Sequence, residues 1–253
     1  MWEGEGATGG FRFRRAGARP DVSSSFPCGR LSLRSPHAGP QAHSGGTTTN
    51  PQAIDAALRA RLGAACADGW RIWERFEAEV RDHEFHLFVA ADYEIVLEAL
   101  LLWRGPGLRF LEWGSASGVI AVMADLMGFE ACGIELDPAL VAMARELAVR
   151  HDSGARFVVG SLLPTGYRWE AGPGGGRAGT LGSGPSGYLQ LGLALDDFDV
   201  VFGYPWGGEA PLMLDLMRQY GRADALLLLY DTEAGVRSYR GGREVVAGGI
   251  ERR

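Results

Sequence analysis

Short apolar runs and helix-like stretches alternate along the chain from Leu108 onward, and this alternation constrains the fold more than any other feature. The apolar runs are four to six residues long, and between them apolar residues recur every three or four positions. Strands separated in this way by helices are typical of a parallel sheet covered on both faces. We therefore expect an α/β fold with strands at Leu108–Glu112, Ala131–Glu135, Arg156–Val159, Phe198–Gly203 and Ala225–Tyr230, and helices at Gly118–Met127, Pro138–His151 and Glu209–Tyr220.

The rest of the chain divides by composition. Residues 1–50 are rich in Gly, Ser, Pro and Arg without apolar periodicity, which predicts a disordered tail; an Arg-rich arm that touches nucleic acid is the alternative. Residues 51–107 have apolar residues at helical spacing and predict an N-terminal helical extension to the core at 108–253. Residues 166–192 contain so many glycines that we expect a long loop, either a lid or an unstructured insertion.

The composition excludes several classes of enzyme and partner. With 46% hydrophobic and 22% charged residues the chain has an ordinary globular balance. All 25 basic residues are arginine, so lysine Schiff-base enzymes and ordinary P-loop NTPases are excluded. The net charge is −6, and residues 1–50 hold six arginines against three acidic residues, which leaves the remainder more acidic still. An acidic body argues against nucleic acid as a partner, because broad phosphate binding needs a basic face.

Cysteine and histidine spacing gives no sign of a metal site. The three cysteines, Cys28, Cys66 and Cys132, are far apart and form no CxxC pair. We therefore expect neither a disulfide framework nor a metal cluster, and we expect the protein to be located in a reducing cytoplasm. His83 and His86 lie three residues apart and lack the i, i+4 spacing of zinc metalloproteases. No apolar run approaches the roughly 18 residues of a spanning helix, so no membrane contact is expected.

Two acidic residues at strand ends indicate a ligand site. Residues 112–118, Glu-Trp-Gly-Ser-Ala-Ser-Gly, close the first expected strand and open a helix, where small residues and free N–H groups allow close approach of an anionic ligand group. Glu135 lies 23 residues after Glu112 at the end of the next strand, a position suited to accept hydrogen bonds from ribose hydroxyls. Together they predict a nucleoside-containing cofactor at the carboxyl ends of the strands. The glycine spacing is not the G-x-G-x-x-G of a dinucleotide site.

This arrangement resembles the class I S-adenosylmethionine-dependent methyltransferase family, with Ala116 where the middle glycine of the first motif is usual. The resemblance implies a Rossmann-like fold and S-adenosyl-L-methionine as cofactor. It implies that Glu112 holds the amino group of the methionine end, that Glu135 binds the ribose and that Leu136 flanks the adenine. The remaining residues of the motif loop would line the methionine end: Gly114, Ser115, Ala116 and Gly118.

Two further motifs of that family have counterparts here. Residues 159–162 resemble the third motif, with Ser161 where an aspartate often faces the adenine amino group and Leu162 beside it. Residues 199–206 resemble the fourth motif, but Gly203 and Tyr204 replace its polar residue and first proline, so methylation of a base or amide is not favoured. By resemblance, the residues facing the methyl acceptor would be Tyr204, Pro205 and Trp206, and Tyr93 would close over the cofactor.

The sequence therefore predicts a methyltransferase acting on an unidentified acceptor, with a small molecule or a protein favoured. A sulfonium donor is already activated, so catalysis needs alignment more than a triad, a metal or a lysine. Two alternatives stay open: a degenerate cofactor-binding scaffold that has lost turnover, and an NAD-dependent oxidoreductase, which the glycine spacing disfavours.

Overall fold

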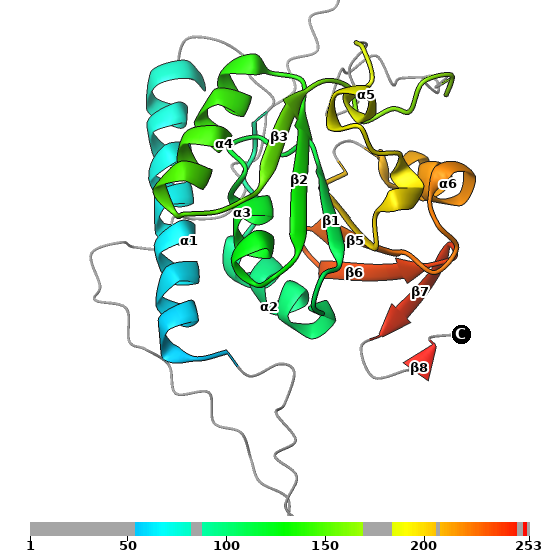
Figure 1. Cartoon of the computed structure of the whole chain (residues 1–253), viewed down its shortest axis with the longest axis horizontal. Helices are drawn as coiled ribbons and strands as arrows, with labels where there is room; N and C mark the ends of the chain where they lie inside the picture. The colour runs from blue at the N-terminus through cyan, green and yellow to red at the C-terminus, as the bar shows by residue number, and fades with distance from the viewer. Residues whose placement is uncertain (1–53, 82–87, 169–183, 206–207, 247–249, 252–253) are drawn as a thin grey trace, which may run out of the picture. The chain divides into compact units, whose positions relative to one another are not determined.

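The computed structural model describes residues 54–81, 88–168, 184–205, 208–246 and 250–251. These residues form one eight-stranded sheet in the order β3-β2-β1-β4-β5-β6-β7-β8 (Figure 1). Its first five strands are parallel, as the sequence predicts: β1 (Arg109–Trp113), β2 (Glu130–Glu135), β3 (Arg156–Val159), β4 (Val200–Gly203) and β5 (Leu226–Asp231).

The order of the parallel strands reverses between β1 and β4. The chain begins in the middle of the sheet at β1, passes through β2 to the edge at β3, and then returns to place β4 on the other side of β1. Glu112 is paired in register with Gly133 of β2 and Phe202 of β4. Ligands of open α/β sheets bind at such a reversal, outside the carboxyl ends of the strands.

The sheet continues with three antiparallel strands at its C-terminal side: β6 (Gly235–Arg240), β7 (Arg243–Val246) and β8 (Ile250–Glu251). The turn between β6 and β7 is Gly241-Gly242, and both glycines have positive φ. Two residues in that conformation make the tight turn of a hairpin, and glycine adopts it without strain.

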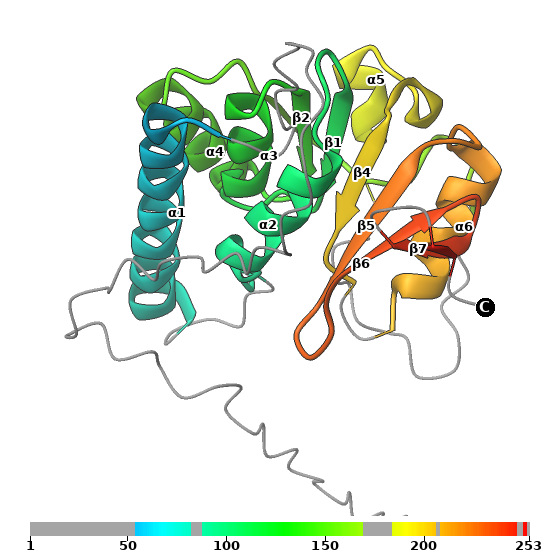
Figure 2. The same ribbon diagram turned by 90° about the horizontal axis from the view of Figure 1, so that it is seen from below.

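Helices cover both faces of the sheet, which confirms the predicted Rossmann-like architecture (Figures 1 and 2). One face is covered by α1 (Ala56–Phe76), α2 (Tyr93–Trp103), α3 (Val119–Leu126) and α4 (Pro138–Arg150). The other face is covered by α5 (Gly187–Leu191), a 3₁₀ turn at Leu195–Asp197 and α6 (Ala210–Tyr220). A short π-helical turn, Glu77–Arg81, follows α1.

Aspartates at the starts of the helices fix where several of them begin. Asp55 accepts a hydrogen bond from the Leu58 N–H, and Asp92 accepts two from the first turn of α2. Asp137 does the same for α4, where Pro138 occupies the first helical position. Such side chains satisfy backbone N–H groups that have no partner within the helix.

The helices of residues 54–103 share a hydrophobic core with the sheet. Leu62 and Cys66 of α1 are buried with Val119 and Met123 of α3. Gly69 of α1 has no room for a larger residue, because a Cβ there would lie 2.7 Å from the Val119 side chain. This close approach brings α1 against the helix that follows the motif loop.

The predicted loop at 166–192 contains one regular element in its described part. Helix α5 forms because Tyr188 and Leu191 are buried against β1, β2 and β3. The Trp113 indole donates a hydrogen bond of 2.8 Å to the Tyr188 hydroxyl, and this bond links α5 to β1. Residues 169–183 and 1–53 lie outside the described residues, so the tail and most of the glycine-rich stretch stay predictions.

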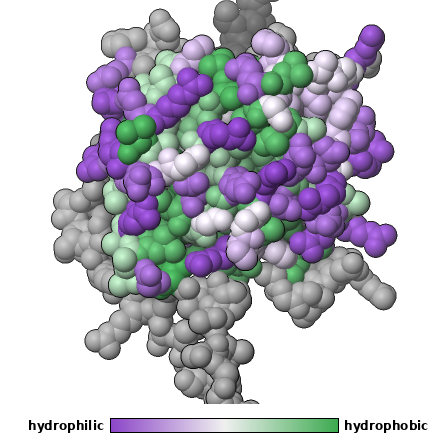
Figure 3. All heavy atoms as spheres, viewed as in Figure 1, coloured by the Kyte–Doolittle hydropathy of each residue, from purple (hydrophilic) through white to green (hydrophobic). Residues whose placement is uncertain are grey.

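In the described parts of the chain, no helix combines the length and apolarity needed to cross a bilayer. On the face of the molecule drawn in Figure 3, hydrophobic residues form separate groups among hydrophilic ones. Cys66 and Cys132 are buried free thiols, and the described residues contain no group of three acidic, histidine or cysteine side chains that could hold a metal ion. The histidines at 83 and 86, considered above as metal ligands, are not among the described residues.

Candidate functional site

A crevice lies at the carboxyl ends of β1 and β4. It is lined mainly by residues 88–91 and 112–117, by Tyr93, and by Phe202 and Tyr204. The crevice therefore combines the predicted motif loop with the end of β4 and with the segment that leads into α2. It lies at the reversal of strand order, where the topology predicts a ligand.

Glu112 is a buried acidic side chain of this crevice. Its side chain is 4% exposed, and one carboxylate oxygen accepts a 2.9 Å hydrogen bond from the Ala121 N–H in the first turn of α3. Burial raises the pKa of Glu112 well above its usual range; the Ala121 hydrogen bond lowers it in part, and the charge of Glu135 raises it further. A buried carboxylate of this kind is stabilised by a cation brought beside it.

Tyr93 covers Glu112 from the start of α2. Its ring is 3% exposed and packs against Trp70, with the ring centroids 4.7 Å apart. Burial raises the pKa of its phenol, the charge of Glu112 raises it further, and a hydrogen bond with Ser117 lowers it in part. Tyr93 thus stays protonated and joins the helical extension to the motif loop.

The motif loop turns sharply between β1 and α3. Gly114, Ala116 and Gly118 all have positive φ, at 64°, 44° and 76°. At Gly118 a Cβ would also lie 2.6 Å from the Phe157 ring, so a glycine is required there for two reasons. Ala116 is the departure from the family motif, and the structure places it in the conformation that favours glycine.

Ser115 makes this loop suitable for a polar ligand. Its side chain is 2% exposed and lines the crevice, yet its hydroxyl has no hydrogen-bond partner. A buried hydroxyl without a partner costs roughly 1–3 kcal/mol, and native proteins rarely retain one without a reason. Together with the carboxylate of Glu112, Ser115 fits the methionine end of S-adenosylmethionine, which carries both an ammonium and a carboxylate.

Glu135 joins the two loops at the ends of β1 and β2. One of its oxygens accepts the Ala116 N–H at 2.8 Å, and the other accepts the N–H groups of Leu136 and Asp137 at 2.7 and 3.0 Å. A carboxylate offers about four lone-pair sites, so three backbone bonds leave one for a ligand. The charge of Glu135 helps to raise the pKa of Glu112. Glu135 itself is not among the residues that line the crevice, so its predicted contact with a ribose stays a prediction.

The residues predicted near the adenine lie just after β3 and β2. Ser161 is buried, and its hydroxyl accepts a 3.1 Å hydrogen bond from the Leu163 N–H. Leu162 is buried in the core on the α5 and α6 side, so its side chain packs there. Leu136 is half-buried beside Glu135. None of these three lines the crevice described above, and their part in binding stays a prediction.

Of the residues predicted to face the methyl acceptor, one lines the crevice and another lies outside the described residues. Tyr204 lines the crevice and meets the ring of Tyr230 edge-on at 4.8 Å. Burial, followed by the effects of Tyr230 and Asp231, raises the pKa of Tyr204 to about 12. Pro205 is half-buried beside it, and Trp206 is outside the described residues. A Cβ at Gly203 would lie 2.8 Å from the Met213 sulfur, so a larger residue there would require the Met213 side chain to shift.

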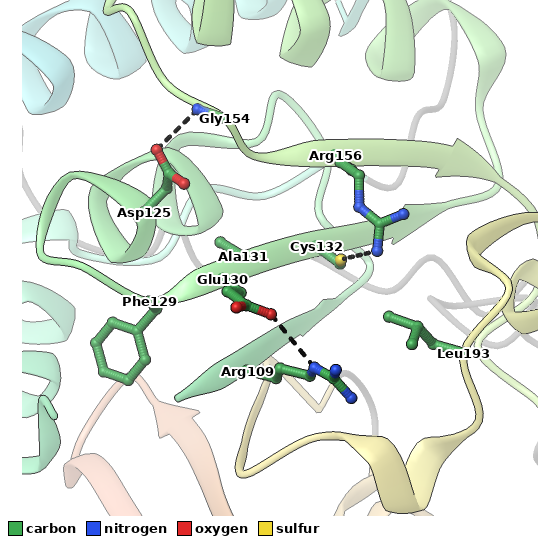
Figure 4. A pocket seen from close by; sticks show the side chains of 9 residues that line it. All are labelled: Arg109, Asp125, Phe129, Glu130, Ala131, Cys132, Gly154, Arg156 and Leu193. Atoms are coloured by element: carbon green, nitrogen blue, oxygen red, sulfur yellow. Dashed lines mark hydrogen bonds and ion pairs between the residues drawn. The ribbon is translucent and has the colours of Figure 1, made fainter. Parts of the chain in front are cut away.

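A second hollow lies at the opposite, amino ends of β1, β2 and β3 (Figure 4). Its charged groups already have partners: Arg109 pairs with Glu130 at 3.3 Å, and Asp125 accepts the Gly154 N–H. Arg156 donates to the Cys132 sulfur at 3.4 Å. This end of a parallel sheet is not where such folds bind ligands.

Sequence reasoning missed part of the crevice. Residues 88–91 line it, but their short apolar run gave no sign that the chain would fold back over the motif loop. Ser117 and Phe202 belong to segments that resemble family motifs, but the sequence does not single them out as site residues. Only the fold shows that they line the crevice. Tyr93, which the family resemblance suggests would close over the cofactor, lines the crevice, and its part in binding stays a prediction.

One curated protein matches part of the chain. The ribosomal protein L11 methyltransferase of Thermus thermophilus is 33% identical over 103 residues, which cover 38% of this chain and 41% of that protein. The match thus spans about two-fifths of the relative's length. Over this segment the chain is similar to a methyltransferase.

The solved structures that resemble this chain are distant from it in sequence and in fold similarity. The precorrin-6y C5,15-methyltransferase of Geobacter metallireducens has a TM-score of 0.39 and 15% identity, with 58% of this chain and 65% of that chain covered. An RNA methyltransferase of Salinibacter ruber, solved with S-adenosyl-L-homocysteine, has a TM-score of 0.39 and 17% identity, with 54% and 74% covered. No family model matches the chain.

Proposed function

We propose that this protein binds S-adenosylmethionine in the crevice at the ends of β1 and β4 and transfers its methyl group to an acceptor beside Tyr204. The observation that carries the proposal is that one crevice is lined both by the buried Glu112, whose carboxylate lies at the start of α3, and by Ser115, whose hydroxyl has no partner. A ligand with an ammonium and a carboxylate complements both. The segment match to a methyltransferase supports the same conclusion.

The residues of the crevice and the motif loop have positioning roles in this proposal. The cofactor, when bound, supplies an activated methyl group. Glu112 would accept hydrogen bonds from the cofactor ammonium, and Ser115 would donate to its carboxylate. Glu135 would accept one ribose hydroxyl with its remaining lone pair while it holds Ala116. Residues 88–91 and Tyr93 would exclude water from this end of the crevice.

The acceptor would approach past Tyr204. With its pKa raised to about 12, this phenol keeps its proton at neutral pH and would donate a hydrogen bond to the acceptor. The acceptor must then bring a nucleophile that is already unprotonated at its reacting atom. A protein substrate is favoured because the curated relative is named for methylation of a ribosomal protein; a small molecule is the alternative.

Calorimetry tests the cofactor. We expect S-adenosylmethionine and S-adenosylhomocysteine to bind and NAD to bind far more weakly. Glu135→Ala should weaken S-adenosylhomocysteine binding by about 1.5–3 kcal/mol, the scale of a hydrogen bond to a charged group. Glu146→Ala, on the exposed side of α4, is the matched control. Tighter binding of NAD would overturn the proposal.

Transfer is tested with S-adenosylmethionine labelled in its methyl group. We expect label from a mixture of proteins and metabolites of the source organism to appear in the protein fraction, and Tyr204→Phe to reduce it. Label in the small-molecule fraction would identify the alternative acceptor class. Tight binding of S-adenosylmethionine with no transfer to either fraction would contradict turnover and leave a cofactor-binding protein.

A further inference from the structure

The return of the 163–186 connection to the sheet brings a second serine to the end of β3. Ser161 and Ser186 form a parallel bridge, in which the Ser161 N–H donates to the Pro185 carbonyl and the Gly187 N–H donates to the Ser161 carbonyl, both at 2.9 Å. Ser186 is separated from Ser161 by 25 residues of sequence but is its direct neighbour in the fold.

Tight backbone packing fixes the position of this returning segment. A Cβ at Gly160 would lie 2.6 Å from the Gly187 backbone, and a Cβ at Gly187 would lie 2.7 Å from the Ile134 side chain. Gly184 lies close to Leu136, since a Cβ at Gly184 would be 3.6 Å from the leucine side chain. Residues 184–187 therefore border the strand ends at which the adenine is expected.

The hydroxyl of Ser186 has no partner in this position. The side chain is 8% exposed, and its oxygen is buried without a hydrogen bond. It precedes the short helix α5 but does not cap it. Since a hydroxyl in that state costs free energy, its retention needs a reason outside the free protein.

We propose that the Ser186 hydroxyl hydrogen-bonds the adenine ring of the bound nucleoside. The inference rests on the proposed function, because it requires an adenosyl ligand at these strand ends. Ser161, at the family's adenine position, uses its hydroxyl oxygen to accept a hydrogen bond from Leu163 within its own turn. Ser186 supplies a second hydroxyl there, from a segment that carries none of the family's motifs.

The test is Ser186→Ala, with Ser186→Gly as a second variant that removes the hydroxyl without adding volume. Because the hydroxyl has no partner in the free protein, the melting temperature of Ser186→Ala should equal or exceed that of the unmodified protein. The affinity for S-adenosylhomocysteine, measured by calorimetry, should fall about 2- to 13-fold, the range of one neutral hydrogen bond. The affinity for adenosine, measured by ligand-observed NMR, should fall by the same factor.

The control is Ser153→Ala. The Ser153 hydroxyl donates to Asp125 at 2.8 Å and lies at the amino-end side of the sheet, so this variant should melt at a lower temperature with unchanged affinity. Unchanged S-adenosylhomocysteine affinity in Ser186→Ala, or a loss that adenosine does not share, overturns the adenine contact. If the unmodified protein binds neither ligand, the failure lies with the proposed function.

Discussion

At the scale of single residues, Ala116 is held in a backbone conformation that suits glycine, with φ of 44°. An L-residue in the left-handed region costs about 1–2 kcal/mol, and the greater freedom of glycine in the unfolded chain offsets about half of that. We expect Ala116→Gly to raise the free energy of unfolding by about 0.5 kcal/mol, measured by urea denaturation.

The control for Ala116→Gly is Ala64→Gly, at an exposed position within α1. There the same substitution should destabilise by about 1 kcal/mol, as in an ordinary helix interior. Equal destabilisation at both sites would mean that Ala116 is not strained.

Glu112 links the stability of the protein to pH. Because its pKa is raised by burial, its contribution to stability is complete below the unfolded pKa, about 4.3, and is lost as the pH rises through the folded value. We expect the free energy of unfolding of the unmodified protein to fall relative to Glu112→Gln as the pH rises from 5 to 8, measured by urea denaturation at each pH. The amide keeps an oxygen for the Ala121 N–H.

The same Glu112→Gln variant should bind S-adenosylhomocysteine more weakly by about 1.5–3 kcal/mol, because the amide carries no charge for the ligand ammonium. If Glu112→Gln is more stable than the unmodified protein at pH 8 but binds S-adenosylhomocysteine more weakly, the Glu112 carboxylate serves ligand binding at the expense of stability. A stability difference that does not change with pH would show that Glu112 keeps one protonation state throughout.

At the scale of elements, Asp68 fastens α1 to the C-terminal end of α4. The Asp68 carboxylate is buried and pairs with His151 at 2.9 Å, with Arg150 at 3.4 Å and with Arg71. From the same helix, Arg61 donates to the His151 carbonyl at 3.0 Å. Burial alone would raise the pKa of Asp68, but its hydrogen bonds to Arg71 and His151 outweigh that and hold it below its usual range.

We expect Asp68→Asn to lower the free energy of unfolding by about 1–2 kcal/mol near neutral pH. A depressed pKa stabilises the fold above the unfolded value of about 3.9, and this contribution is lost as the pH falls through the folded value. The difference between the two proteins should therefore shrink below pH 4 in urea titrations. Glu74→Gln, exposed on α1, should show no such difference.

Sequence alone placed the elements because their signals are local. The apolar runs mark the buried strands to within one or two residues, and helical spacing places α3, α4 and α6 equally closely. The contacts that complete the site are distant in sequence and leave no periodic signal. Ser186 beside Ser161 is one case, and residues 88–91 over the motif loop are another. The polar partners of Asp68 likewise appear only once α1 and α4 are packed.

At the scale of the whole molecule, α1 and α2 share their core with α3 and the sheet. We therefore expect residues 54–246 to unfold in one transition, seen alike by tryptophan fluorescence and far-UV circular dichroism. S-adenosylhomocysteine at 100 times its dissociation constant should stabilise that transition by about 2.7 kcal/mol. Two separate transitions, with only one shifted by the ligand, would make the helical extension an independent unit.

The carboxylate of Glu135 accepts N–H groups from the loops after both β1 and β2. Neither loop can move without disturbing the other, so a change that loosens one is transmitted to its neighbour. Substitutions at Ala116 and Leu136 should then be non-additive in a double-mutant cycle. The methionine and nucleoside halves of the ligand would be recognised cooperatively.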